Sequence, residues 1–475
     1  MHRHNRRTFL KSTGAAVAGL ALGPQISHAA ANPFTRPPNI LFIMVDDLGK
    51  EWLHCCGSEE KLTPNIDALA AGGMRLENAY SMPLCTPTRA ALLTGQYPFR
   101  NGWVNHWDVP RFGGGAHFDP EHNPSFARML RDAGYRTAIA GKWQINDFRI
   151  QPDVLGRHGF DEWCVWTGGE MDNPPSDERY WSPYIHTRGG SQLYTGAFGP
   201  DVYTNFLIDF MHRHKDNPMM LYFPMCLTHT PFVHTPTNPA ADDRYAKQRA
   251  MVRYTDECVG RLVNALDELG LREDTIIFFC TDNGSTHGIE AKRNGRTIQG
   301  GKGQMTESGV NMPCIVNGPG RVPAGVALDA LIDITDMLPT FAALAGAELP
   351  DGYTCDGENL APVILGEAED GPRSWIMAMG GGRAVLNDNR RIVPEKDFAG
   401  RVLRDKRYKL YVDTDRAPHK LIDLETDPGE EHNIIDTPEE RAAAAREKLL
   451  AALATFPRKD AAPRYDPLPP QPWEK

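Results

Sequence analysis

From residue 39 onward, apolar runs of strand length alternate with amphipathic stretches of helical length, and turn residues separate them. The run Asn39 to Val45 is almost continuously apolar, which is typical of a strand buried on both faces of a sheet. Three more apolar runs lie at residues 137–140, 219–227 and 276–281, and no internal repeat is visible. The pattern predicts an α/β fold with a large, mainly parallel sheet flanked by helices.

The texture of the chain changes after about Leu365, where charged and turn-rich segments replace the long apolar runs. Residues 405–413 and 420–425 have the character of short antiparallel strands. A capping-box spacing at Thr437-Pro438-Glu439-Glu440 predicts a helix that begins there and continues through Leu453. We therefore expect a main domain over residues 34–365 and a smaller C-terminal α+β subdomain over residues 366–475, with a small antiparallel sheet and a terminal helix.

Polar residues follow each of the four apolar runs, at the point where the predicted strand ends. These pairs are Asp46-Asp47, Gly141-Lys142, Thr228-His229 and Asp282-Asn283. Ligands bind outside the carboxyl ends of the strands in open α/β sheets, so the four pairs are expected to converge. A single polar pair after a strand is more often the start of a loop, and the prediction therefore depends on the four occurring together.

Two of these pairs indicate a metal site. Asp46, Asp47, Asp282 and Asn283 offer only oxygen ligands, which suit a hard cation and disfavour zinc. Calcium accepts irregular sets of carboxylate and amide oxygens, so it is the first choice and magnesium the second. The alternative is that each pair forms a turn or a helix cap.

A cysteine stands just ahead of another predicted helix, in the segment Cys85-Thr86-Pro87-Thr88-Arg89. Free backbone N–H groups and the helix dipole favour an anion at this position, and Arg89 adds a forked donor. On these residues alone, Cys85 could be a thiolate nucleophile, although the spacing to Arg89 is shorter than in a phosphatase loop. A short motif of this kind is weak evidence by itself.

The longer segment from Cys85 to Gly95 resembles the signature of the sulfatases, in which the cysteine is oxidised to formylglycine. Other stretches follow in the family's order, namely Thr63-Pro64-Asn65-Ile66-Asp67, Gly141-Lys142-Trp143, His229-Thr230-Pro231, Thr281-Asp282-Asn283-Gly284, Lys302-Gly303 with Glu307, and residues 421–433. The resemblance covers roughly residues 38 to 435 and implies the alkaline-phosphatase-like fold.

The resemblance also implies a role for each matching residue. The metal would be held by Asp46, Asp47, Asp282, Asn283 and an oxygen of the modified Cys85. Arg89, Lys142 and Lys302 would neutralise the sulfate, and His229 would protonate or orient the leaving alcohol oxygen. The implied reaction is hydrolysis of a sulfate ester, with a sulfated carbohydrate as the substrate expected by analogy and a formylglycine-generating maturase as a partner.

The chain departs from the family pattern at two places. Gln144 stands where the family has a histidine that assists formylglycine turnover, and an amide cannot act as a base. Either His287 or Lys142 takes this role, or product release is slow. The second departure is Ser308 and Asn311, where sulfatases often carry glycine and arginine, and it implies nothing specific.

The candidate substrate residues are less specific than the metal and sulfate residues. The insertion over residues 101–122, with Trp103, His106 and Trp107, and the aromatic-rich segment over residues 163–194 could form a wall that stacks on a sugar ring. Packing within the loop is an equal alternative. Gln144 and His287 complete the candidate set.

The first 31 residues resemble a twin-arginine signal peptide. Arg6-Arg7 precedes Phe9-Leu10-Lys11, a short and weakly apolar stretch follows, and Ala29-Ala30-Ala31 offers small residues for cleavage. That stretch is too short for a stable membrane span. We expect export by the Tat machinery to the periplasm or beyond, after folding and modification of Cys85 in the cytoplasm.

Charge and cysteine content narrow the alternatives. A net charge of −10 over 475 residues argues against a nucleic-acid partner. The nine cysteines show no metal-finger spacing, and no disulfide is assigned. Three other functions stay open: a phosphonate or phosphate ester hydrolase of the same superfamily, a catalytically silent glycan-binding protein, and a cysteine-nucleophile enzyme.

Overall fold

The computed structural model describes residues 36–106, 116–170, 173–381, 384–389, 391–469 and 471–473. The predicted signal peptide and Trp107 lie outside these residues. The first strand of the sheet, β1 (Asn39–Val45), is buried along its whole length. The other apolar runs form β3 (Arg136–Lys142), β7 (Met219–Pro224) and β8 (Thr275–Thr281), close to the predicted bounds.

The large sheet is parallel at its centre, and its outer strands pair antiparallel apart from β13, which is parallel to β2. In the order in which they lie side by side, its strands are β11 (Asn311–Met312), β2 (Met74–Tyr80), β12 (Cys314–Asn317), β8, β1, β7, β3, β4 (Glu162–Trp166), β5 (Tyr184–Thr187) and β6 (Gly190–Leu193), and β13 (Val326–Asp333) pairs with β2. The pairs of β1 with β7 and β8, and of β3 with β7 and β4, are all parallel.

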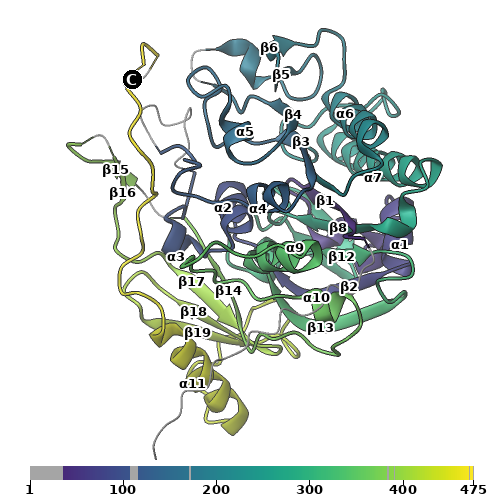
Figure 1. Ribbon diagram of the computed structural model, residues 1–475. Coiled ribbons are helices and arrows are strands. Elements are labelled where there is room, and N and C mark those ends of the chain that lie inside the picture. Colours follow the sequence, from purple (N-terminus) through teal and green to yellow (C-terminus); the bar gives the residue numbers. More distant parts are fainter. Residues whose placement is uncertain are drawn as a thin grey trace, which may run out of the picture.

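Helices cover both faces of this sheet (Figure 1). On one face lie α2 (Cys85–Thr94), α4 (Phe126–Asp132) and α9 (Met337–Ala345), and on the other α1 (Pro64–Ala71), α6 (Gly199–His214) and α7 (Arg244–Glu268). Alternate residues of β1 enter the two cores, with Ile40, Phe42 and Met44 on the first face and Leu41, Ile43 and Val45 on the second. Because both faces are buried, the strand is apolar at every position. This arrangement confirms the predicted fold class.

The remaining elements are short. The helices are α3 (Pro98–Asn101), α5 (Val154–Arg157), α8 (Glu307–Val310) and α10 (Ala361–Ile364), with 3-10 turns η1 (Lys50–Trp52), η2 (His54–Cys56), η3 (Pro174–Asp177), η4 (Arg272–Asp274) and η5 (Ile334–Asp336). Two hairpins, β9 (Glu290–Arg293) with β10 (Arg296–Gln299) and β15 (Ala384–Leu386) with β16 (Ile392–Pro394), complete the set. No helix among the described residues is long and apolar enough to cross a membrane.

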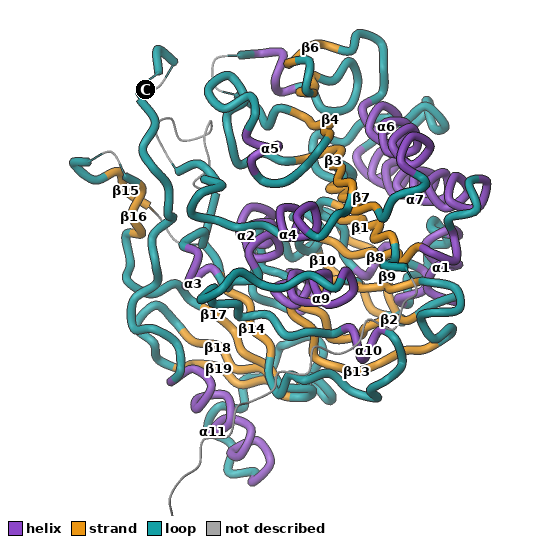
Figure 2. Tube along the Cα trace, in the orientation of Figure 1, coloured by secondary structure: helices purple, strands orange, loops and turns teal. Residues whose placement is uncertain are grey.

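A second, four-stranded antiparallel sheet lies toward the C-terminus, with α11 (Glu440–Ala454) beside it (Figure 2). Its strands are β14 (Ile376–Met379), β17 (Arg401–Arg404), β18 (Tyr408–Val412) and β19 (Pro418–Asp423). Leu403 and Leu410 of this sheet belong to the same continuous core as Phe42 of β1. The smaller C-terminal subdomain is therefore present, while its boundary at residue 365 stays a prediction.

The predicted start of the terminal helix is wrong. The helix begins at Glu440 rather than at Pro438, and Glu439 precedes it without a side-chain cap. The hydroxyl of Thr437 accepts a weak hydrogen bond from the N–H of Glu439, so it closes a local turn and not the helix.

Candidate active site

The carboxyl ends of β1 and β8 bring four oxygen-bearing side chains together. Val45 pairs with Thr281, so Asp46 and Asp47 leave the sheet beside Asp282 and Asn283. The backbone N–H of Asp47 donates to Asp282 Oδ1 over 3.2 Å, and the Asn283 amide donates to Asp47 Oδ1 over 2.8 Å. All four side chains are buried. The predicted convergence of the two pairs is what the fold produces.

Helix α2 brings Cys85 and Arg89 to the same place, and every residue of this helix is buried. One ligand atom from each of Asp46, Cys85 and Asp282 lies within 4.8 Å of the others. The Arg89 guanidinium contacts Asp282 Oδ2 at 2.7 Å and lies 3.9 Å from Asp46 Oδ2. Cys85 is thus at the first turn of a helix and against the acidic cluster.

Two lysines complete the ring of charge around the aspartates. Lys142, the last residue of β3, contacts Asp46 Oδ2 through Nζ at 2.6 Å, and its side chain is buried. Lys302 contacts Asp47 Oδ1 through Nζ at 2.7 Å, and its side chain is 16% exposed. Each predicted sulfate-binding cation therefore lies within ion-pair distance of a predicted metal ligand.

Burial and neighbouring charges shift the pKa values of Asp46 and Asp282 in opposite directions. Burial opposes ionisation of Asp46, but Lys142, His229 and Arg89 outweigh it and hold the pKa of Asp46 well below its usual value. Burial and the neighbouring Asp46 carboxylate raise the pKa of Asp282 well above its usual value. Two carboxylates that repel each other away from water are stabilised when a cation lies between them.

The cluster fits a hard divalent cation. Oδ1 of Asp46 and Oδ1 of Asn283 are buried and have no hydrogen-bond partner among the described residues. A buried oxygen without a partner is costly, and these two belong to the side chains that the sequence assigns to a metal. Carboxylate and amide oxygens are the ligand types of calcium and magnesium.

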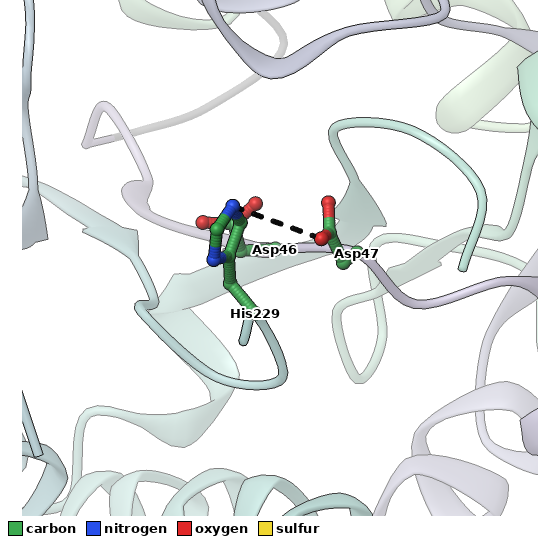
Figure 3. Close-up of side chains that lie close together, drawn as sticks. All are labelled: Asp46, Asp47 and His229. Atoms are coloured by element: carbon green, nitrogen blue, oxygen red, sulfur yellow. Dashed lines mark ion pairs between the residues drawn. The ribbon is translucent and has the colours of Figure 1, made fainter. Parts of the chain in front are cut away.

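His229 faces the two aspartates from the loop after β7 (Figure 3). Its Nε2 lies 3.8 Å from Asp47 Oδ2, while Nδ1 lies 2.6 Å from the carbonyl oxygen of Thr230 and 3.1 Å from an N–H of Arg179. Burial lowers the pKa of His229 to about 4, because it outweighs the attraction of Asp46 and Asp47. The imidazole is therefore neutral at neutral pH and carries its proton on only one ring nitrogen.

The predicted substrate residues Trp103 and His106 lie in different surroundings. Trp103 is fully buried and packs edge-on against Phe118, which favours the alternative of packing over a substrate wall for this ring. His106 instead contacts the nucleophile position: Nε2 lies 3.7 Å from Cys85 Sγ, and Nδ1 lies 2.8 Å from the Thr86 hydroxyl.

Gln144 and His287 differ sharply in position. Gln144 follows Lys142 closely, is 5% exposed, and has a side-chain oxygen that is buried without a partner among the described residues. His287 is exposed, and its backbone carbonyl accepts a hydrogen bond from Arg244. No contact between the His287 ring and the acidic cluster is present among the described side chains, so the structure gives its predicted replacement role no support.

Two residues of the site were not predicted from the sequence. Arg179 lies in an aromatic-rich loop that carries no recognisable motif, so only the fold reveals its contact with His229. Thr88 lies within the Cys-x-Pro-x-Arg motif, and its hydroxyl donates to the backbone carbonyl of Asp282 over 2.7 Å. The position of Thr88 inside the nucleophile motif could have indicated its part in the site.

Comparisons with known proteins agree with this geometry. The sulfatase family model matches residues 38–347, and the model for the C-terminal part of N-sulphoglucosamine sulphohydrolase matches residues 301–456. Arylsulfatase A of Bos taurus is 31% identical, covering 93% of this chain and 92% of the relative. N-acetylgalactosamine-6-sulfatase of Canis lupus familiaris is 33% identical, covering 70% of this chain and 66% of the relative.

Solved structures show the same fold along most of the chain. Ps i-CgsB has a TM-score of 0.75 and is 25% identical, covering 90% of this chain and 95% of its own. BT4656, in complex with its substrate D-glucosamine-2-N,6-O-disulfate, has a TM-score of 0.69 and is 20% identical, covering 89% and 98%. With the family model matched over residues 38–347 and arylsulfatase A similar along almost the whole length, the chain belongs to the sulfatase family of sulfuric ester hydrolases.

Proposed function

We propose that this sulfatase hydrolyses sulfate esters of carbohydrates with a formylglycine made from Cys85 and a divalent cation, calcium ahead of magnesium. The observation that carries the proposal is the buried grouping of Cys85 with Asp46 and Asp282, in which an oxygen of Asp46 has no partner among the described residues. These oxygen ligands suit a hard cation, which a soft thiol binds poorly, so an oxygen-bearing residue at position 85 fits the site better than an unmodified cysteine.

Hydrated formylglycine at position 85 would supply a hydroxyl nucleophile, and the cation would supply a Lewis acid for the sulfate. Asp46, Asp47, Asp282 and Asn283 would hold the cation. Three cationic side chains around the cation site would neutralise the sulfonyl oxygens, namely Arg89, Lys142 and Lys302. Burial strengthens each of these interactions, because water does not screen them.

His229 is placed to act on the alcohol side of the ester. Its Nε2 faces the aspartates, and its side chain is 20% exposed, so a substrate can reach it. With Nδ1 accepting from the N–H of Arg179, Nε2 would bear the proton of the neutral ring and donate a hydrogen bond to the leaving oxygen, rather than act as a full cation. That donation stabilises the oxygen on which charge develops.

The carbohydrate class rests on relatives. The similar N-acetylgalactosamine-6-sulfatase and the sugar disulfate bound by BT4656 support a sulfated sugar over a simple aryl sulfate. Export by the Tat machinery to the periplasm or beyond is part of the proposal, and it rests on residues 1–31 of the sequence, with a formylglycine-generating maturase acting first in the cytoplasm.

The decisive measurement is the mass of the peptide that contains Cys85, on protein produced together with a formylglycine-generating enzyme. We expect the mass of the aldehyde or its hydrate, bound calcium by elemental analysis, and sulfate release from sulfated sugars that is lost in Cys85→Ala. An unmodified thiol would contradict the proposal. If an aryl phosphonate is turned over faster than the matching aryl sulfate, the result would favour a phosphonate hydrolase. Binding of sulfated sugars without turnover would favour a silent glycan-binding protein.

A further inference from the structure

Arg179 lies against the residue proposed to face the leaving alcohol. It belongs to the loop between η3 and β5, and an N–H of its guanidinium lies 3.1 Å from His229 Nδ1. Its Cζ lies 3.9 Å from the centroid of the Trp166 ring, at the end of β4. Stacking on an aromatic face fixes the plane of a guanidinium, so the group is held ready for a planar contact.

The charge of Arg179 is not balanced within the described part of the chain. Arg89, Lys142 and Lys302 each contact an aspartate, but no carboxylate of a described residue lies within ion-pair distance of Arg179. Its Nε is buried and has no hydrogen-bond partner among the described residues. A partly buried cation without a counter-ion is costly, unless an anion from outside the chain completes it.

The position of Arg179 indicates which part of a substrate would supply that anion. The His229 ring faces Asp47 with Nε2 and Arg179 with Nδ1, so Arg179 is separated from the acidic cluster by the imidazole. The sulfate that is cleaved must lie on the side of the cluster. A group that reaches Arg179 therefore belongs to the alcohol part of the ester.

We propose that Arg179 binds a second anionic group, a sulfate or a carboxylate, on the sugar that carries the scissile sulfate. The preferred substrates are then carbohydrates with at least two negative charges close together. This inference rests on the proposed function, in particular on the placement of the alcohol beside His229. The terminal guanidinium nitrogen that does not contact His229 would donate its N–H groups to the oxyanion.

The test compares matched sugars in two variants, Arg179→Gln and Arg179→Lys. The panel contains hexose monosulfates, the same hexoses with a second sulfate, and the same monosulfates on uronic acids. We expect Arg179→Gln to lower kcat/KM for the doubly anionic sugars by about 10- to 100-fold more than for the monosulfates. Arg179→Lys keeps the charge and loses the planar guanidinium, so it should fall in between.

The matched control is Arg188→Gln, because Arg188 also lies over a tryptophan ring, that of Trp163, but is exposed and has no contact with His229. Circular dichroism and melting curves check that each variant folds. A selective loss of kcat/KM on the disulfated sugars would identify the second group as a sulfate, and a selective loss on the uronic acids would identify it as a carboxylate; either result supports the proposal. An equal loss of kcat/KM on all substrates would overturn the proposal, because Arg179 would then only position His229. An unchanged kcat/KM on all substrates would overturn it as well.

A binding experiment separates this inference from the proposed function. In the Cys85→Ala background, which cannot turn over, calorimetry measures the affinity for the same sugars with Arg179 and with Arg179→Gln. A selective loss of affinity for the doubly anionic sugars would support the anion site, whether or not the wild type releases sulfate. If the wild type releases no sulfate, only the proposed function is refuted. Equal affinities would overturn the inference.

Discussion

At the residue scale, the chain has Gln144 where the family has a histidine, and another histidine, His106, lies near Cys85. Gln144 has a positive φ of 63° and a buried amide oxygen, and an amide can neither take up nor release a proton at neutral pH. An imidazole reaches Cys85 from another segment, since His106 Nε2 lies 3.7 Å from Sγ. If Nδ1–H donates to the Thr86 hydroxyl, Nε2 is left as the acceptor that faces position 85.

We therefore expect His106→Ala to lower kcat by about 100-fold or more, because a positioned imidazole typically contributes at least this factor to proton transfer. His287→Ala should leave the rate within about twofold, because the ring is exposed and has no contact with the acidic cluster among the described side chains. Steady-state kinetics on one sulfated sugar measures both variants, with the mass of the Cys85 peptide showing equal modification. A large effect of His287→Ala and none of His106→Ala would restore the assignment made from sequence.

The residues of the site differ in how far the sequence predicts them. Asp46, Asp282 and Lys142 follow apolar runs, so the rule that ligands bind at strand ends locates them without a structure. His106 could be named as a candidate, but its contact with Cys85 depends on the path of a loop. Arg179 lies in the aromatic-rich segment 163–194, but nothing in that segment distinguishes this arginine from an ordinary surface residue.

At the scale of elements, the hydroxyl of Thr88 adds to the contact of Arg89 with Asp282 in holding α2 to the end of β8. Thr88 Oγ1 lies 2.7 Å from the carbonyl of Asp282, 2.9 Å from that of Leu84 and 3.1 Å from the N–H of Met82. The helix starts at Cys85, so this contact sets the distance between the nucleophile position and the aspartate. Thr88 is fully buried, which excludes water as a substitute partner.

Thr88→Val keeps the shape of the side chain and removes these hydrogen bonds. We expect the free energy of unfolding to fall by about 1–3 kcal/mol, because buried polar groups of the backbone lose their partner. We also expect activity to fall, because α2 can shift against Asp282. Thr94→Val is the matched control: its hydroxyl bonds to Ala90 within the same helix, so stability should fall with little change in activity. Equal activity losses in both variants would show that the contact with Asp282 has no special part in the site.

The elements themselves were predictable where the hydrophobic pattern was strong. β1 matches the predicted run at both ends, because burial on both faces makes every position apolar. The start of α11 was missed because Thr437 and Pro438 have the local signature of a helix start, and the chain uses them for a turn instead. Local propensity competes there with the path of the chain onto the small sheet.

At the scale of the whole molecule, Glu307 joins the two sheets. Its carboxylate contacts Arg404 of β17 at 2.8 Å and Lys409 of β18 at 3.1 Å, and it accepts a hydrogen bond from the hydroxyl of Tyr80 in β2. The Lys409 side chain is fully buried and also contacts Glu430 at 2.9 Å. A carboxylate that lies within a sulfatase motif thus serves here to connect the small sheet to the large one.

This connection should make the joint between the sheets sensitive to acid. Burial alone would raise the pKa of Glu307, but Arg404 and Lys409 outweigh it and hold the pKa well below its usual value. A lowered pKa in the folded state means that the carboxylate stabilises the fold above its ordinary pKa of about 4.3, and that this stabilisation is lost as the pH falls further.

Glu307→Gln should therefore lower the free energy of unfolding by about 3 kcal/mol near neutral pH, because it leaves the buried Arg404 without a carboxylate and Lys409 with Glu430 alone. The difference from the wild type should shrink as the pH falls below about 4, because Glu307 of the unfolded wild-type chain then takes up a proton, which favours unfolding, while the folded carboxylate does so only at a lower pH. Melting curves between neutral pH and pH 3 measure this, with Glu425→Gln as control, since Glu425 is 65% exposed and pairs with Arg407 at the surface. A difference that stays constant over this range would show that Glu307 contributes through its shape and hydrogen bonds, and not through its charge.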